Sequence, residues 1–196
     1  MEQHKERPDM ILPHIHNSNI QDSKGIAQPR YYVGIDPDVD KSGLVVIDRQ
    51  SRCILHADAL DFPSAIGYLR LLQQEHAQDP FTLLVVIEDS DASVNWHYNP
   101  KDKAGVIAAK GRSVGMCHAT IRHLREYCEH LGLPVRMQQP LRKLWRGKDG
   151  KITHEEAALF MPGLPARTNQ EVRDAALLAW EVAGLPIRIQ SIKKHI

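Results

Sequence analysis

The stretch YYVGIDPDVDKSGLVVID, residues 31–48, decides the fold of this chain. Two apolar, β-branched runs flank a turn-forming segment rich in Asp, and a third run, CILHADA, begins at Cys53. Short runs of this kind, separated by turn residues, predict neighbouring strands joined as an antiparallel meander. An acidic residue, Asp36, comes directly after the first run.

Helices and further strands alternate after the meander. Apolar residues recur at helical spacing over 62–76, and the nearly continuous run FTLLVVIE at 81–88 indicates a strand buried on both faces. The segment 104–131 is long enough for a helix that stops at Gly132, and PVRMQQ predicts one more strand. We therefore expect an α/β fold in the order β-β-β-α-β-α-β-α, with five strands in one mixed sheet.

Length and composition favour one folded domain. The chain has 196 residues, of which 42% are hydrophobic and 25% charged, as in globular proteins with a packed core. Residues 1–29 have no sustained period, and we interpret them as a flexible N-terminal extension before a domain over 30–196. The longest aliphatic run, 83–87, is too short to span a membrane, and the N-terminus lacks a signal-peptide core. We expect a cytoplasmic protein without membrane association.

Two capping boxes predict where the C-terminal helices begin. Thr153 to Glu156 and Thr168 to Glu171 fit the S/T-x-x-E pattern, in which the first and fourth side chains satisfy each other's free backbone N–H groups. The second box would open a final helix over about 169–183.

Four carboxylates stand out by their positions. Asp36 follows the first strand and Glu88 ends the buried strand, while a third and a fourth acid share one face of the final helix because of their i,i+3 spacing, Glu171 and Asp174. Clustered carboxylates suit Mg²⁺ or Mn²⁺, and two such ions can activate water and stabilise the leaving oxygen in phosphodiester hydrolysis. Each acid alone also fits a purely structural role, as a turn residue, a strand end or a helix cap.

Five segments, taken in order, resemble the successive motifs of the RuvC-like Holliday-junction resolvases: YVGIDPDVDKSGLVVID, VVIED, KGRSVGM, QQPLRK and NQEVRDAALLAW. The resemblance extends from about Tyr31 to Ala183. It implies an RNase H-like fold, a homodimer, and Mg²⁺-dependent symmetrical nicking of branched DNA. By position the resemblance also implies four catalytic metal ligands: Asp36, Glu88, Glu171 and Asp174. They would hold two Mg²⁺ ions, for which Mn²⁺ could substitute.

The chain departs from the family pattern in three places. Extra residues, including Trp96 and Tyr98, lie where the resolvases insert an aromatic residue toward the junction centre. A lysine of the family's basic loop corresponds to His154. The fourth ligand position is held by Glu171, one methylene longer than Asp, which would reach the metal through water.

A cationic stripe lies between residues 136 and 151 of a chain whose net charge is only +1. Lys and Arg neutralise phosphates without reading sequence, and aromatic side chains stack on unpaired bases. We expect the nucleic-acid contacts to come from this stripe, the aromatic insertion and the start of the long helix: Arg142, Lys143, Lys148, Lys151, Trp96, Tyr98, Lys110 and Arg112. A solvated loop with ordinary surface aromatics accounts for the same residues.

Small residues recur at helical spacing along the long helix, at Ala108, Gly111, Gly115 and Ala119. This face would admit either a second helix in a homodimer or the chain's own sheet in ordinary core packing.

Other functions fit the motifs less well. The series Asp36, Asp38 and Asp40 begins like a calcium loop, but Lys41 stands where glycine is needed. An actin-like ATPase needs a second Asp-Gly-rich phosphate loop, which the sequence lacks, so we expect no nucleotide cofactor. Two alternatives stay open: a nuclease for forks, flaps or RNA–DNA hybrids, and a non-catalytic DNA-binding module of the same fold.

Overall fold

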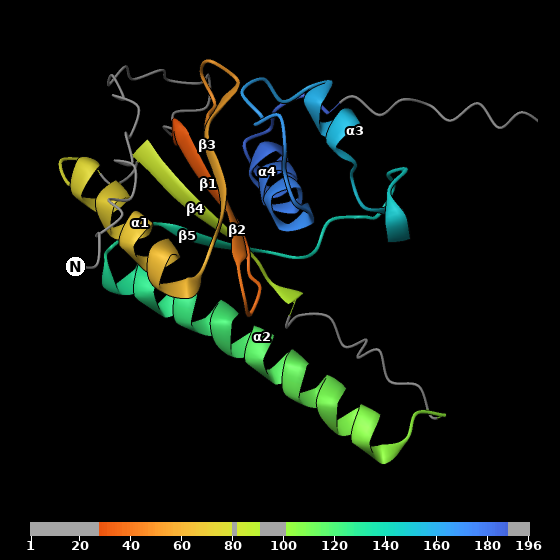
Figure 1. The fold of residues 1–196 in the computed structure, drawn as a ribbon. Coiled ribbons are helices and arrows are strands. Elements are labelled where there is room, and N and C mark those ends of the chain that lie inside the picture. Colours follow the sequence, from red (N-terminus) through yellow and green to blue (C-terminus); the bar gives the residue numbers. More distant parts are fainter. Residues whose placement is uncertain (1–27, 80–81, 91–100, 188–196) are drawn as a thin grey trace, which may run out of the picture.

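The computed structural model describes residues 28–79, 82–90 and 101–187, and its centre is one five-stranded mixed sheet (Figure 1). The strands are β1 Tyr31–Asp36, β2 Ser42–Asp48, β3 Cys53–Leu60, β4 Leu83–Glu88 and β5 Val135–Gln138, in the spatial order β3-β2-β1-β4-β5. β2 is antiparallel to β1 and β3, whereas β4 is parallel to β1 and β5. The predicted meander and mixed sheet are confirmed. Residues 1–27 of the expected N-terminal extension lie outside the described residues.

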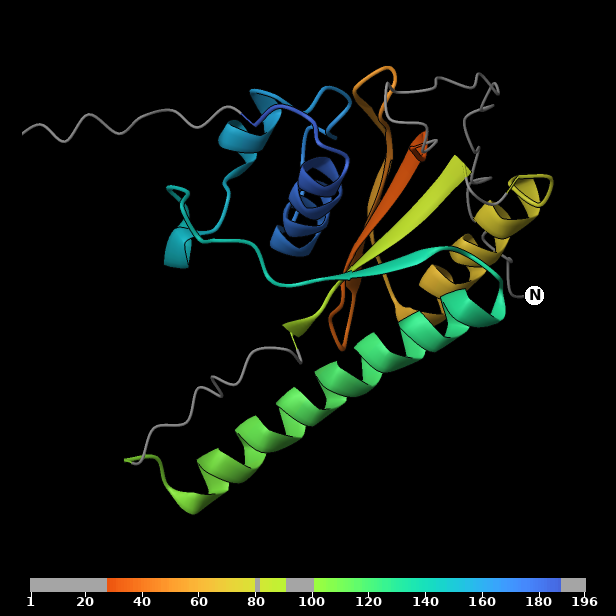
Figure 2. The same ribbon diagram turned by 180° about the vertical axis from the view of Figure 1, so that it is seen from behind.

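Helices cover both faces of the sheet (Figure 1 and Figure 2). α1 Phe62–Glu75 and α2 Ala104–His130 lie on one face, and α4 Gln170–Val182 lies on the other, preceded by η3 Lys148–Gly150 and α3 His154–Ala158. Alternate residues of a strand point to opposite faces. Accordingly Val33 and Ile35 of β1 pack with α1 and α2, while Tyr32 packs with α4. This double burial explains why the central strands are almost continuously hydrophobic.

Two glycines let α4 lie directly on the sheet. A Cβ atom at Gly34 of β1 would overlap the backbone carbonyl of Ala175, and one at Gly43 of β2 would overlap that of Glu171. Both contacts are with the α4 backbone, which cannot move aside as a side chain can. The glycines therefore fix the height of α4 above β1 and β2.

The structure confirms one predicted capping box and corrects the other. Thr153 Oγ1 accepts the Glu156 N–H, and the Glu156 carboxylate accepts the Thr153 N–H. The Thr168 box is wrong, because α4 is capped by Asn169, whose side-chain oxygen accepts the Val172 N–H at 3.0 Å. The Thr168 hydroxyl instead lies 3.0 Å from His154 Nδ1, which links α3 to the start of α4.

The N-terminal half of α2 extends past the edge of the sheet in both views (Figure 1 and Figure 2). The buried residues of α2 all lie in its C-terminal part, at Ile121, Leu124 and Cys128. No heavy atom among the described residues would come within 4 Å of a Cβ at Gly111 or Gly115. Packing against the chain's own sheet, one of the two expected explanations of the small residues, is therefore wrong for these two glycines.

The cysteines are all free thiols, at Cys53, Cys117 and Cys128. Among the described residues, the structure contains no helix that combines the length and hydropathy needed to cross a membrane.

Candidate active site

Two of the predicted acids meet because the strands that carry them are parallel neighbours. β1 pairs with β4 in a register that sets Ile35 beside Ile87, so the next residues, Asp36 and Glu88, end the two strands at the same edge of the sheet. Carboxyl ends of adjacent parallel strands are where α/β sheets commonly form their sites. The sequence positions of these acids, each directly after a hydrophobic run, were a sufficient signal.

The third acid comes from the helix that covers this edge. Asp174 lies in the first half of α4 and lines, together with Asp36 and Glu88, a cavity of about 360 Å³, here called the acid cavity. Three cationic side chains, Arg142, Lys143 and Lys151, also line it. The remaining lining residues are Ser90, Pro140, Leu141, Trp145, Gly150, Ile152 and Leu177.

Burial and mutual repulsion perturb the two strand-end carboxyls. The pKa of Asp36 is raised from 3.8 to about 8, first by burial and then by the negative charges of Glu88 and Asp174. The pKa of Glu88 is also raised, again by burial first and then by Asp174. A carboxyl group is held in its acid form in this way when its surroundings supply too little positive charge. The acid cavity therefore has the electrostatics of a cation site.

Part of the missing positive charge comes from Lys151. Its Nζ donates to Asp174 Oδ2 at 2.8 Å, and Gln170 Nε2 donates to the other oxygen, Oδ1, at 2.7 Å. Both oxygens of Asp174 are thus engaged by side chains. Within the described residues, no three His, Cys, Asp or Glu side chains are arranged as a ready-made metal site.

Glu171 is less directly placed than the other three acids. It does not appear in the lining of the acid cavity, and its backbone carbonyl rests over Gly43. Its charge still contributes to the raised pKa of Asp36, although less than the charges of Glu88 and Asp174. The carboxylate therefore lies near the cavity without forming its wall.

The predicted nucleic-acid-binding residues divide into groups. Arg142, Lys143 and Lys151 line the acid cavity, and Lys148 is exposed in η3 nearby in sequence. Lys110 and Arg112 lie on α2, where Lys110 Nζ pairs with Asp102 Oδ2 at 2.6 Å. Trp96 and Tyr98 lie outside the described residues.

Two residues that sequence reasoning missed are Gln170 and Trp145. Gln170 donates a hydrogen bond to Asp174, one helical turn further along. The i,i+4 spacing of the two residues is visible in the sequence, but many surface glutamines have an acidic residue at the same spacing, so it did not single out Gln170. The Trp145 indole stacks on Phe160 with ring centroids 5.9 Å apart and lines the acid cavity. Trp145 lies within the cationic stripe of the sequence, and nothing in that stripe indicated that its side chain would line a cavity.

Comparisons with known proteins find likeness in structure only. No protein-family model and no curated protein matches the chain significantly. Thermus thermophilus RuvC aligns with it at 13% identity and a TM-score of 0.43 in a complex with a Holliday-junction substrate, covering 76% of this chain and 89% of that chain. A second RuvC structure from the same organism aligns at 18% identity and a TM-score of 0.42, covering 79% and 96%. The large terminase nuclease from the thermophilic phage G20c aligns at 17% identity and a TM-score of 0.30, covering 77% and 81%.

The fold itself is assigned from the sheet. Its strands follow the order 3-2-1-4-5, with the second strand antiparallel to both neighbours. Helices pack on both faces, and the acids gather at the carboxyl ends of the two central parallel strands. With this topology the chain has the RNase H-like fold.

Proposed function

We propose that this chain is a Mg²⁺-dependent, structure-specific endodeoxyribonuclease that cleaves branched DNA by phosphodiester hydrolysis. The observation that carries the proposal is the meeting of Asp36, Glu88 and Asp174, from three separate elements, in one cavity flanked by Arg142 and Lys143. Converging carboxylates supply the hard oxygen ligands that Mg²⁺ prefers, and neighbouring cations suit a phosphate backbone.

The carboxylates fit a metal site by charge, and one ion pair must open to complete it. Asp36, Glu88 and Asp174 would hold two Mg²⁺ ions, with Glu171 completing the set and Mn²⁺ able to substitute. When bound, such ions activate water and stabilise the departing oxygen of the phosphodiester. Asp174 would exchange Lys151 for metal, which leaves the lysine ammonium free to hold a substrate phosphate.

The DNA would lie across the cationic surface beside the acid cavity. Arg142, Lys143 and Lys148 are exposed, so their charges are available to phosphates at low desolvation cost. Lys110 and Arg112 on α2 would contact a second part of the backbone. Trp96 and Tyr98 would stack on unpaired bases at the branch point.

A homodimer would use the uncovered face of α2. Val106 and Met116, in the N-terminal half of the helix, are 44% and 47% exposed. A Cβ at Gly111 or Gly115 would meet no atom of the described residues within 4 Å. Small residues let two helices approach closely, and a two-fold assembly matches a substrate that is cut at two symmetry-related positions.

One observation favours a non-catalytic DNA-binding module instead. The Lys151–Asp174 pair already neutralises part of the acid cluster, as an ion pair would if the cavity no longer held metal. A nuclease for forks, flaps or RNA–DNA hybrids shares all the features above, and only substrate comparison separates it from a resolvase.

The test is a cleavage assay on matched substrates. Purified protein is incubated with an end-labelled four-way junction, a linear duplex of the same sequence, a fork and an RNA–DNA hybrid, with Mg²⁺ or with chelator. We expect paired, metal-dependent nicks in the junction and little cleavage of the duplex. Tight binding with no cut on any substrate would establish the binding module and overturn the nuclease.

The raised pKa of Asp36 predicts that metal binding depends on pH. The folded-state pKa of Asp36, about 8, lies above its ordinary value of 3.8 in an unfolded chain. The contribution of this carboxyl to the stability of the metal-free fold is therefore fully present below about pH 3.8 and is lost as pH rises through about 8. Metal binding requires the carboxylate, so near neutral pH it should release a proton from Asp36. Apparent metal affinity should therefore rise by up to about tenfold per pH unit below pH 8.

Calorimetric titration of Mg²⁺ in buffers of different ionisation heats measures this proton release directly. The Asp36→Asn variant should release about one proton fewer than the wild type under the same conditions. Equal proton release by the two proteins would show that Asp36 is already ionised before metal binds.

A further inference from the structure

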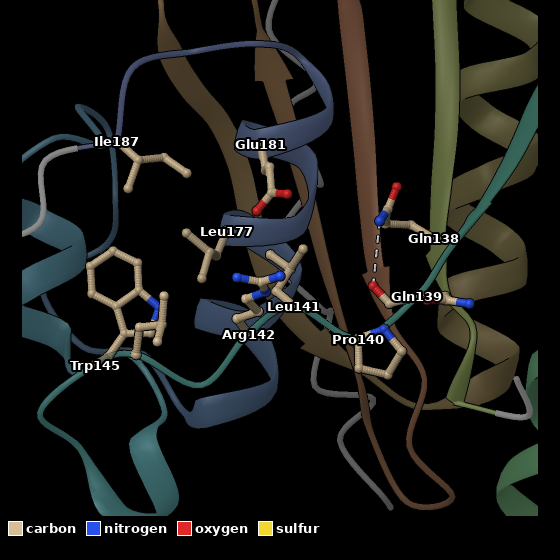
Figure 3. A pocket seen from close by; sticks show the side chains of 10 residues that line it. Gln138, Gln139, Pro140, Leu141, Arg142, Trp145, Leu177, Glu181 and Ile187 are labelled. Carbon is tan, nitrogen blue, oxygen red and sulfur yellow. Dashed lines mark hydrogen bonds between the residues drawn. The ribbon is translucent and has the colours of Figure 1, made fainter. Parts of the chain in front are cut away.

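A second cavity of about 310 Å³ adjoins the acid cavity and is unused by the proposed chemistry (Figure 3). It is here called the side groove. Its walls come from the end of β5, the following loop, α4 and the segment after α4: Gln138, Gln139, Pro140, Leu141, Arg142, Leu144, Trp145, Leu177, Glu181 and Ile187.

The side groove and the acid cavity share part of one wall. Both are lined by Pro140, Leu141, Arg142, Trp145 and Leu177. A DNA strand whose scissile phosphate lay at the carboxylates would therefore bring a neighbouring nucleotide to the groove. Arg142 lines both spaces, and a guanidinium is suited to bind the phosphate between the two.

The lining combines flat apolar surfaces with polar groups that have no partner. Figure 3 shows Trp145 and Ile187 on one side of the groove and Pro140 with Gln139 on the other, with Leu177 and Glu181 of α4 between them. In the part of the chain that the structure describes, the side chains of Gln139 and Glu181 make no hydrogen bond. Such groups can still bind the edges of a planar, polar ring.

The aromatic wall is held in place from behind. One face of the Trp145 indole stacks on Phe160 at an interplanar angle of 17°, and Phe160 meets the buried Trp180 edge-on with centroids 6.1 Å apart. Trp180 Nε1 donates to the Pro186 carbonyl, so this chain of rings is anchored in the core. A rigid aromatic surface loses little entropy when a ligand packs against it.

We propose that the side groove binds one unpaired nucleobase of the DNA substrate, next to the scissile phosphate. The inference rests on the proposed nuclease function and names a specificity site for it. The base packs between Trp145 and the aliphatic side chains, and Gln139 and Glu181 read its edge. The Glu181 carboxylate only accepts hydrogen bonds, so the groove prefers a base whose exocyclic amino group donates at its edge. The single N–H on the corresponding edge of thymine lies between two carbonyl oxygens, which the carboxylate repels.

The test is an abasic scan of the junction, measured as binding by the full chain in chelator, where no cleavage occurs. One abasic nucleotide at a time replaces each base around the wild-type cleavage sites. We expect one position at which loss of the base weakens binding about fivefold or more, because stacking on an aromatic side chain is lost. At that position thymine should bind more weakly than cytosine or adenine.

Two variants assign the effect to the groove. Ile187→Trp fills the side groove. This variant should bind the intact junction as weakly as the wild type binds the junction with the abasic nucleotide. Removing the base should then not weaken binding by the variant any further. Leu159→Trp adds the same bulk at a residue that is 48% exposed and outside the lining, and should keep the full effect. Glu181→Ala, an exposed substitution, should erase the discrimination against thymine while leaving the abasic effect.

The outcomes separate this inference from the proposed function. A flat abasic scan by a protein that still cleaves the junction in Mg²⁺ overturns the base site and leaves the nuclease standing. If removal of the base weakens binding by the Ile187→Trp variant as much as by the wild type, the base binds outside the side groove, and the base site is again overturned. A wild-type protein that neither binds nor cuts DNA overturns both proposals together.

Discussion

Replacing Asp36 by Asn is expected to lower metal-dependent cleavage of branched DNA by about 1,000-fold or more. Asp36 lines the acid cavity, and its pKa is raised by the charges of Glu88, Asp174 and Glu171. An amide keeps the shape of the carboxyl group but cannot supply the negative charge that a pair of Mg²⁺ ions needs. Loss of several kcal/mol of transition-state stabilisation corresponds to a rate loss of this order. Initial rates on a labelled four-way junction measure it.

Folding and DNA binding should survive the same substitution. The neutral amide removes like-charge repulsion with Glu88, so without metal the variant should melt no lower than the wild type above about pH 8. Junction affinity in chelator should be largely unchanged, because the phosphate contacts come from the cationic side chains.

Asp38→Asn is the matched control for Asp36→Asn. Asp38 lies two residues further along and is exposed, and its Oδ1 accepts the Asp40 N–H at 2.9 Å, a bond that Asn can keep. We expect near-normal cleavage from this variant. If both variants lose cleavage equally, the cause is the turn rather than a carboxylate at the metal site.

The sequence alone predicted the sheet because its signals are local. Apolar runs of five to eight residues, broken by turn residues, are set by strand length and burial, which do not depend on distant contacts. The start of α4 was mispredicted by one residue, since Thr168 and Asn169 both have capping side chains. The Thr168 hydroxyl is engaged by His154 of α3, a contact between distant residues that the local pattern does not show.

The candidate site, like the fold, was predictable where its signals are local and not where they depend on distant contacts. Asp36 and Glu88 could be placed together because adjacent parallel strands end at one edge. The Lys151–Asp174 pair could not, because it joins residues 23 apart whose approach depends on how the loop after β5 packs. The side groove was equally out of reach, since its lining comes from separate segments around α4.

The glycines of the opening motif lead to the second large effect. Gly43→Ala is expected to destabilise the protein by about 3 kcal/mol, at the upper end of the cost of overpacking, because the new Cβ would meet the Glu171 carbonyl and neither backbone can yield freely. Urea unfolding of the wild type and variant measures the difference in free energy of unfolding. Gly34→Ala should act in the same direction through the Ala175 carbonyl.

Gly67→Ala is the matched control for a glycine without a packing role. Gly67 is an exposed residue inside α1, and a Cβ there would meet nothing within 4 Å. Alanine is the better helix former, so this variant should gain about 0.5–1 kcal/mol. A Gly43→Ala protein as stable as the wild type would mean that α4 does not rest on β2.

The same contact connects the fold to the chemistry. α4 carries Asp174, whereas Asp36 and Glu88 belong to the sheet, so the spacing among the three carboxylates depends on how closely the helix approaches. Gly34→Ala raises α4 at Ala175, the residue directly after Asp174. Under conditions where the variant is still folded, its Mg²⁺ affinity should fall while its junction affinity in chelator stays close to that of the wild type. Equal loss of both affinities would indicate general unfolding instead of a displaced helix.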